Sequence, residues 1–181
     1  KEKDPRYKRQ NSDNSNYNFH QFRMSLTQGF DMGNLGRSSY WANAGTFINA
    51  EEISFVDYQH FNGNQTQVGT SANYTNVFNN LPYYDFSTNK SYLEGHIEHD
   101  FKGWILGKIP GINTLNFNLV VGAHLLASQE RKPYSEFSVG IDNLGFGKYR
   151  LLRVDYVHSN FNGAQNGTFV FGLKFLGLVG L

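Results

Sequence analysis

The stretch from Ser91 to Leu126 constrains the fold most, because its side chains alternate between apolar and polar over two long runs. In the first run, residues 91–105, one parity is apolar and the other is charged. The apolar parity comprises Leu93, Ile97, Phe101 and Ile105, and the charged parity comprises Glu94, His96, Glu98, Asp100 and Lys102. Successive side chains of a β-strand point to opposite faces, so the pattern predicts a strand with one apolar and one charged face.

The second run, residues 115–126, predicts another strand with an unbroken apolar face, formed by Leu115, Phe117, Leu119, Val121, Ala123 and Leu125. Both runs exceed the usual strand length of about five or six residues and match the roughly 9–11 residues that cross a bilayer at a tilt. The residues between them, GKIPGIN at 107–113, are typical of a short turn. The stretch therefore predicts a hairpin of an antiparallel transmembrane β-barrel.

The composition fits this interpretation. Aromatic residues make up 16% of the chain, yet the mean hydropathy is −0.50. A barrel turns only every second residue of a strand toward lipid, so its mean hydropathy stays low, whereas a helical membrane protein needs about 20 consecutive apolar residues. The net charge of +1 predicts no nucleic-acid partner, and the absence of cysteine excludes disulfides and thiol chemistry.

The rest of the chain predicts further strands separated by polar turns. Residues 1–16 are charged and rich in Asn and Ser, which predicts a polar loop or tail, and residues 177–181 are expected to form a C-terminal tail. Barrel strands are expected within residues 17–176. Besides the central hairpin, they are predicted at 17–30, 40–50, 53–61, 134–142, 149–161 and 169–175, with a weaker one at 66–78.

The connections and the strand count predict the topology of the barrel. Longer polar loops at 78–90, 127–133 and 160–167 are expected on the extracellular side, and short turns at 107–113 and 143–148 on the periplasmic side. With about eight or nine strands, the chain is expected to be the C-terminal half of a larger barrel, because complete bacterial barrels normally have an even count. The alternative is a complete eight-stranded barrel in which residues 66–78 are a loop.

Strand parity sorts the candidate functional residues into two sets. The lumen-lining set comprises Glu94, His96, Glu98, Asp100, Glu136, Asp142, Arg153 and Asp155. The lipid-facing set comprises Leu115, Phe117, Leu119, Val121, Phe137, Val139, Ile141, Phe169, Phe171 and Leu173. The aromatic residues Trp41, Trp104, Tyr83, Tyr84 and Tyr92 are typical of the girdles at the membrane interfaces.

The polar residues predict structure rather than catalysis. His96 and His99 lie three apart on one strand and point to opposite faces, so they cannot bind one zinc ion. His96, Glu98 and Asp100 share a face and leave a hard-cation site as an alternative. Arg153 and Asp155, on the same parity as the acidic residues of the preceding strand, favour an ion-pair ladder over a selectivity filter. The chain has no catalytic motif, so we expect no enzymatic activity, no metal and no cofactor.

Several motifs resemble a known family. They are DYQHFNGN at 57–64, HIEHDFKGWILGKIPGIN at 96–113, YSEFSVGIDNLG at 134–145 and RLLRVDYV at 150–157. They are similar to the C-terminal β-barrel of a Bacteroidetes outer-membrane family of unknown function, whose members usually carry an N-terminal carboxypeptidase-regulatory-like domain. That barrel is in turn similar to the BamA-type superfamily, although the Arg-Gly-Phe/Tyr motif of the BamA lumen loop is missing here.

The resemblance implies a non-enzymatic protein of the bacterial outer membrane with a role in envelope biogenesis or transport. Its expected partners are outer-membrane lipid and other outer-membrane proteins within a complex. One alternative is a passive pore or a structural membrane subunit. Another is a soluble, lipocalin-like barrel that binds a ligand.

The apolar parity also predicts a mutational effect. Leu119→Arg should destabilise the membrane-inserted fold by about 2–4 kcal/mol if Leu119 lies near the bilayer midplane, because a charge then faces hydrocarbon. Unfolding by denaturant in lipid vesicles measures this change. A side chain at 119 that packs inside a core would contradict the membrane interpretation.

Overall fold

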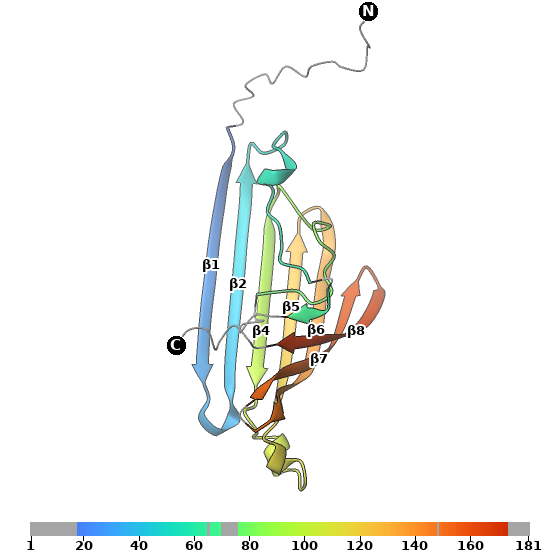
Figure 1. Cartoon of the computed structure of the whole chain (residues 1–181). Helices are drawn as coiled ribbons and strands as arrows, with labels where there is room; N and C mark the ends of the chain where they lie inside the picture. Colours follow the sequence, from blue (N-terminus) through green and yellow to red (C-terminus); the bar gives the residue numbers. More distant parts are fainter. Residues whose placement is uncertain (1–17, 65, 70–75, 148, 174–181) are drawn as a thin grey trace, which may run out of the picture.

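The computed structural model describes residues 18–64, 66–69, 76–147 and 149–173, and these form one all-β sheet (Figure 1). The strands are β1 (His20–Asp31), β2 (Arg37–Ile48), β3 (Val68–Gly69), β4 (Tyr92–Asp100), β5 (Asn118–Ser128), β6 (Arg131–Phe146), β7 (Tyr149–Phe161) and β8 (Ala164–Leu173). Short 3₁₀ turns occur at η1 (Gly33–Leu35), η2 (Phe55–Asp57), η3 (Leu106–Lys108) and η4 (Asn113–Leu115). No helix in the described part of the chain is long and apolar enough to cross a membrane.

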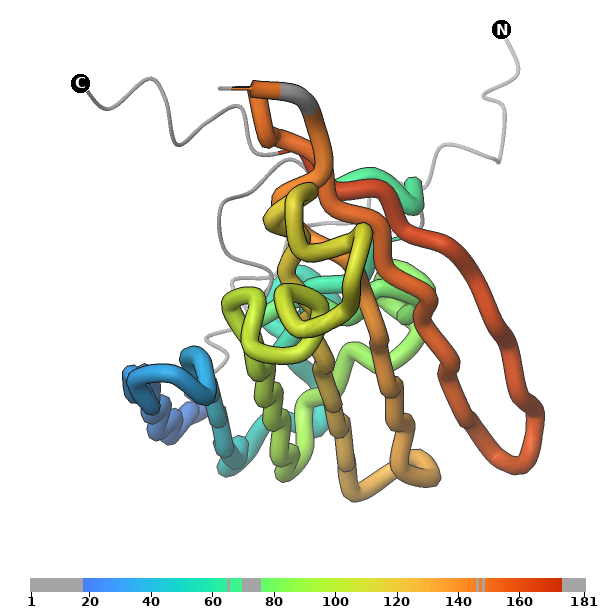
Figure 2. Tube along the Cα trace, turned by 90° about the horizontal axis from the view of Figure 1, so that it is seen from below, coloured from blue at the N-terminus to red at the C-terminus, as the bar shows by residue number. Residues whose placement is uncertain are grey.

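The strand order in the sheet is β1-β2-β4-β5-β6-β7-β8-β3. All neighbours are antiparallel except the two-residue strand β3, which runs parallel to β8. Seen along the strands, the sheet curves around the segment that joins β2 to β4, residues 49–91 (Figure 2). The prediction of an antiparallel all-β protein is therefore confirmed.

The sheet is open. Within the described residues β1 pairs with β2 alone, and β8 pairs with β7 and β3. A complete eight-stranded ring, which the sequence left as an alternative, would require β1 to pair with β8. That alternative is wrong for this sheet. The predicted polar tails at 1–16 and 177–181 lie outside the described residues.

Cross-strand register gives the two faces of the sheet opposite characters, because directly paired residues share a face. One face, called the outer face, is mainly apolar on the seven long strands. A row across its middle runs through Tyr40, Ile97, Ala123, Phe137 and then His158. The neighbouring row on the opposite face runs through Trp41, His96, His124, Glu136 and Ser159. This second face, called the inner face, is the one that segment 49–91 covers.

The apolar core lies between segment 49–91 and one end of the inner face. It consists of Phe61, Phe78, Leu81, Phe86, Tyr92, Leu126 and Tyr134, with Phe47 and Phe161 packed against it. The sequence predicts strands at 53–61 and 66–78 within this segment. The first prediction is wrong, and in the described part of the second range only the two-residue strand β3 is formed. The described residues there form η2, the two-residue strand β3 and two isolated bridges. Ile53, Phe61 and Phe78 are buried, whereas Phe55, Val56 and Val68 are at least 50% exposed. Residues 70–75 lie outside the described residues.

The central stretch also departs from its prediction. β4 ends at Asp100, and β5 begins only at Asn118. The connection 101–117 contains η3 and η4 and has positive φ at Lys102, Gly103, Gly111 and Asn116, so the short turn at 107–113 is wrong. Pro110 and the glycines favour turns over a continued ladder. Trp104, which sat on the charged parity, lies in this connection and not in a strand.

The other connections are shorter than predicted. β5 and β6 are joined by residues 129–130, and β7 and β8 by residues 162–163. The polar loops expected at 127–133 and 160–167 are therefore mostly strand, and Pro133 lies within β6 beside a register shift. The sequence predicts three long loops at one end of the sheet, and of these only the loop at 78–90 is present as a long connection. The longest connection at the opposite end is 101–117 (Figure 1).

The turn between β1 and β2 generates a prediction. Gly36 is buried with φ +111, and a Cβ there would collide with the Asp100 carbonyl oxygen and lie 2.8 Å from the Phe101 Cα. Gly36→Ala should therefore lower the free energy of unfolding by about 2 kcal/mol or more. The control is Gly107→Ala, where a Cβ meets nothing within 4 Å. Equal unfolding midpoints for the two variants would contradict the close approach at Gly36.

Candidate functional site

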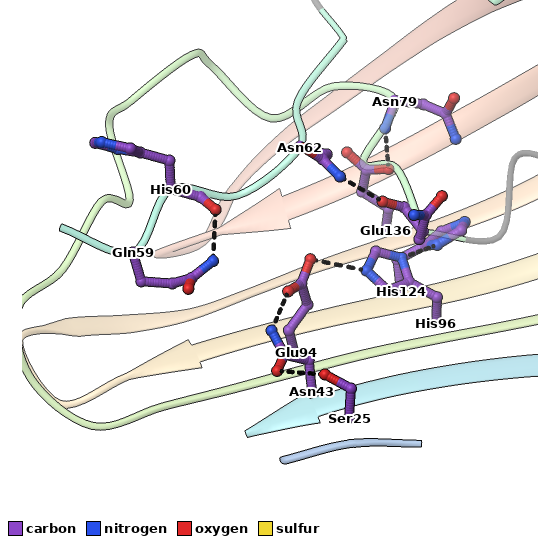
Figure 3. A network of polar contacts seen from close by, with 11 residues as sticks. Ser25, Asn43, Gln59, His60, Asn62, Asn79, Glu94, His96, His124 and Glu136 are labelled. Carbon is purple, nitrogen blue, oxygen red and sulfur yellow. Dashed lines mark hydrogen bonds and ion pairs between the residues drawn. The ribbon is translucent and has the colours of Figure 1, made fainter. Parts of the chain in front are cut away.

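The inner face carries an unusual concentration of buried polar side chains. Those on the strands are Asn43, Glu94, His96, His124, Glu136, Ser138, Asp142, Arg153, Asp155 and Ser159, each at most 5% exposed. Charged and amide side chains are rarely buried unless their hydrogen bonds are satisfied. The contacts they make divide into three groups. A central network around the two histidines and a carboxylate that holds segment 49–91 are drawn in Figure 3, and the third group is an ion-pair cluster.

The central network runs across four neighbouring strands. Ser25 of β1 donates to Asn43 Oδ1 of β2 at 3.1 Å, and Asn43 Nδ2 donates to Glu94 Oε2 of β4 at 3.4 Å. Glu94 Oε1 lies 3.1 Å from His96 Nε2, and His96 Nδ1 lies 2.8 Å from His124 Nδ1 of β5. These side chains occupy the same face because every pairing in this part of the sheet is in register.

The short distance between the two imidazoles limits their protonation states. A hydrogen bond between the two Nδ1 atoms needs one donor and one acceptor, so at least one of His96 and His124 is neutral. With Nε2–H donating to Glu94, a neutral His96 accepts from His124 through Nδ1. If His96 is charged, it donates from both nitrogens. The arrangement can pass a proton between the two rings and places the Glu94 carboxylate beside His96.

Glu136 holds the covering segment. Its side chain is 0% exposed, and it accepts hydrogen bonds from the backbone N–H groups of Asn79 at 2.7 Å and Asn80 at 2.6 Å. The hydroxyl of Tyr134 donates to the same carboxylate at 2.5 Å. Three donors on one carboxylate replace the water it has lost, which is what a buried acidic group requires.

The ion-pair cluster lies toward the other end of the strands. Arg153 Nε of β7 donates to both oxygens of Asp155, at 3.0 and 2.7 Å, and Arg153 Nη2 lies 2.8 Å from Glu98 Oε2 of β4. The Arg153 side chain is 6% exposed, so these bonds form largely away from water. The cluster joins strands that are not neighbours in the sheet. The ion-pairing predicted for Arg153 and Asp155 is confirmed, with Glu98 as a partner that the prediction did not name.

The eight predicted lumen-lining residues all lie on the inner face. The structure buries Glu94, His96, Glu136, Asp142, Arg153 and Asp155, and it half-buries Glu98 and Asp100. His99 lies on the outer face, where its Nδ1 contacts Ser38 Oγ at 2.7 Å, apart from His96 as the parity predicted. Within the described residues, no group of three or more His, Asp or Glu side chains is placed to hold a metal ion.

Eight of the ten predicted lipid-facing residues lie on the outer face of strands. Phe137, Val139, Ile141, Phe169 and Phe171 are between 40% and 60% exposed, whereas Leu119, Val121 and Leu173 are half-buried. Leu115 and Phe117 do not lie on the sheet, which corrects their prediction. Leu115 ends η4 and Phe117 precedes β5, because the ladder begins only at Asn118.

Two girdle predictions are also wrong. Trp41 is paired with His96 on the inner face, with ring centroids 5.4 Å apart, and Tyr92 is 5% exposed in the core. Their parity carried this information, since both alternate with outward apolar residues. Parity also places His96 and His124 each on the polar face of its strand, and the register of β4 with β5 then makes them neighbours. No local signal indicates Asn79 and Asn80, because their contacts depend on the path of segment 49–91.

The outer face is not uniform. A groove of about 440 Å³ crosses β2, β4, β5 and β6. The small residues Ala42, Gly95 and Ala123 line it together with larger ones, among them Tyr40, Phe137 and the two histidines of the central network, His96 and His124. Its lining is almost wholly apolar, in keeping with the surrounding face.

Comparison with known proteins places the chain in a family but assigns no activity. The model of a family of unknown function (DUF5686), C-terminal domain, matches residues 6–141. No curated protein and no solved structure matches the chain.

Loss of the buried ion-pair cluster should lower the free energy of unfolding much more than loss of an exposed ion pair. Arg153→Met leaves Asp155 and Glu98 without their cation, and should lower the free energy of unfolding by about 3–5 kcal/mol. The control is Lys102→Met, whose partner Asp31 is 61% exposed, and it should have a much smaller effect. Denaturant unfolding in detergent micelles measures both. Comparable losses would contradict the buried character of the Arg153 cluster.

Proposed function

This chain belongs to the C-terminal domain of a family of unknown function (DUF5686), and from its geometry we propose that it forms part of a non-enzymatic β-barrel in the bacterial outer membrane. Its role is envelope biogenesis or transport, in a complex with other outer-membrane proteins. The observation that carries this proposal is the inverted distribution of side chains between the two faces.

The inversion is visible along a single strand. On β6, Glu136 and Ser138 are 0% and 5% exposed, whereas Phe137 and Val139, which alternate with them, are 60% and 54% exposed. The pattern continues to the edge, where Met24 of β1 is 75% exposed. A soluble monomer rarely leaves so large a contiguous apolar face in water. Lipid accommodates it, since an outward apolar band and a polar interior are the features of membrane barrels.

The open edge supports a larger barrel. All twelve residues of β1 are exposed, and one side of this strand has no partner in the described sheet. In a bilayer each unpaired backbone group costs several kcal/mol, so a membrane sheet closes on itself. We therefore infer that further strands pair with β1 and complete the ring.

The inner face favours this proposal over a lipocalin-like carrier and over a passive pore. A lipocalin-like carrier would need an apolar interior for its ligand, whereas the inner face here carries Glu98, Arg153 and Asp155. A passive pore would need an open lumen, and segment 49–91 occupies part of the inner face with an apolar core. A structural subunit of a membrane complex remains compatible with the same features.

Spin labels test the membrane orientation. The chain has no cysteine, so Phe137→Cys and Val139→Cys each provide one labelling site on the outer face. In vesicles, both labels should collide more often with oxygen, which concentrates in lipid, than with a water-soluble nickel chelate. Glu52→Cys, in the exposed part of segment 49–91, is the aqueous control and should show the reverse. Preferential collision of the Phe137 and Val139 labels with the nickel chelate would overturn the membrane proposal.

The proposed role has a separate test. The tagged protein, cross-linked in native cells and purified from outer membranes, should retain a defined set of envelope proteins. Recovery of the chain alone, together with a steady open channel in planar bilayers, would instead support a passive pore.

A further inference from the structure

Segment 49–91 is much longer than the pairing of β2 with β4 requires. β2 and β4 are antiparallel neighbours, and their ladder reaches the pair Gly45–Tyr92. The hydroxyls of Thr46 and Ser91 then lie 2.9 Å apart, so the two strands are already side by side where the segment leaves and returns. Antiparallel neighbours can be joined by a loop of about two to five residues. The longer path is therefore a separate feature of the inner face.

The last part of this segment, residues 76–90, is called the plug. It enters the space beside the middle of the sheet, where the Phe78 ring lies 4.5 Å from the His96 ring and 5.8 Å from the Tyr134 ring. Phe78 is 0% exposed and Leu81 is 1% exposed, so the plug is well packed. Asn80 Nδ2 also reaches Ser159 Oγ on β7, at 3.4 Å.

The plug is attached by contacts that differ from those of the sheet. Its backbone forms isolated bridges, Gln59–Thr88 and Gly63–Phe78, with another part of segment 49–91 and not with a long strand. Its polar contacts with the sheet include Glu136, which accepts both the Asn79 and the Asn80 N–H groups. Asn80 also donates to Ser159, and Thr88 Oγ1 donates to Glu130 Oε2 at 3.1 Å, in the turn between β5 and β6. Because the isolated bridges run within segment 49–91, release of the plug would break no pairing between long strands. Its release is opposed by the burial of Phe78 and Leu81 and by its polar contacts, so loss of the Glu136 contact would weaken the plug's attachment without removing a strand pair.

We propose that residues 76–90 are a lumen plug, that Glu136 is the clasp that holds it against the inner wall, and that release of the clasp opens the lumen at this level. The inference rests on the proposed function in one respect, since the inner face encloses a lumen only in a completed barrel. The clasp itself is a property of the described residues and can be tested apart from the membrane.

The test uses Glu136→Gln in the full-length protein. Glutamine keeps one acceptor oxygen but places an NH₂ group against one of the two backbone N–H donors. The reporter is Ser159→Cys, a near-isosteric change at a position that is 5% exposed beneath Asn80. A second reporter is Val120→Cys, at a position 1% exposed toward the other end of β5, which reports opening of the sheet itself. Labelling by a water-soluble maleimide is followed in detergent micelles.

Glu136→Gln should raise the labelling rate of the Ser159→Cys reporter by at least about tenfold and leave the Val120→Cys reporter unchanged, because a buried charge-assisted contact is lost only at the plug. Glu136→Asp should have a smaller effect, because it keeps the charge. The control, Glu52→Gln, removes the same charge at an exposed position and should leave both rates unchanged. An equal rise in the labelling rates of both reporters, or no rise in either, would contradict the proposal that Glu136 holds the plug.

Conductance measurements test whether the plug blocks ion flow through the lumen. In planar bilayers, Glu136→Gln should pass more ion current than the unaltered protein and the Glu52→Gln control. Selective labelling of the Ser159→Cys reporter without any increase in current would show that the plug does not block ion flow. The conclusion that Glu136 holds the plug would still stand. Failure of the unaltered protein to insert into bilayers would count against the proposed function, and the labelling result in micelles would still stand.

Discussion

The rest of the structure depends on the hydrogen bonding of the polar groups buried on the inner face. An unpaired carboxylate or guanidinium in such a place would be strongly destabilising. Each main group has at least one partner from another strand or from segment 49–91. Glu94 contacts Asn43 of β2 as well as His96 of its own strand, and Arg153 contacts Glu98 of β4 as well as Asp155 of its own strand. Glu136 receives two backbone amides of segment 49–91. With the polar groups satisfied inside, the apolar residues of the same strands are left outside.

This arrangement reverses the usual distribution of polar and apolar side chains between the two faces of a β-sheet. Most antiparallel sheets with one wet face place apolar residues on the core side. Here the inner face combines a small apolar core, around Phe78 and Leu126, with charged networks, and the apolar alternation points away from both. A surrounding medium of low polarity makes the two faces consistent, which is the physical basis of the proposed membrane location.

Segment 49–91 ties together strands that the ladder alone would leave far apart. Gln59 contacts Arg23 of β1 at 2.5 Å, Glu136 of β6 holds Asn79, and Gln67 accepts from the Phe171 N–H of β8 at 2.8 Å. One connection thus contacts both edges and the middle of the open sheet. In the described part of the segment, these contacts come from side chains, backbone amides and the packed core, and only the two-residue strand β3 joins the sheet ladder.

Sequence periodicity alone determined the strands and their faces. For β1, β2, β4 and β7 the alternation of apolar and polar residues identified the strand, and parity placed Glu94, Glu136, Arg153 and Asp155 on one face together, because the two-residue repeat is a local property of the backbone. Tertiary structure decided what local patterns cannot encode. The apolar residues of 53–61 and 66–78 resemble strands, yet several of them pack against the inner face. The ladder ends at Asp100, where glycines and left-handed residues turn the chain. The partners of His96 and Glu136 come from residues distant in sequence, and only the path of the folded chain brings His124, Asn79 and Asn80 to them.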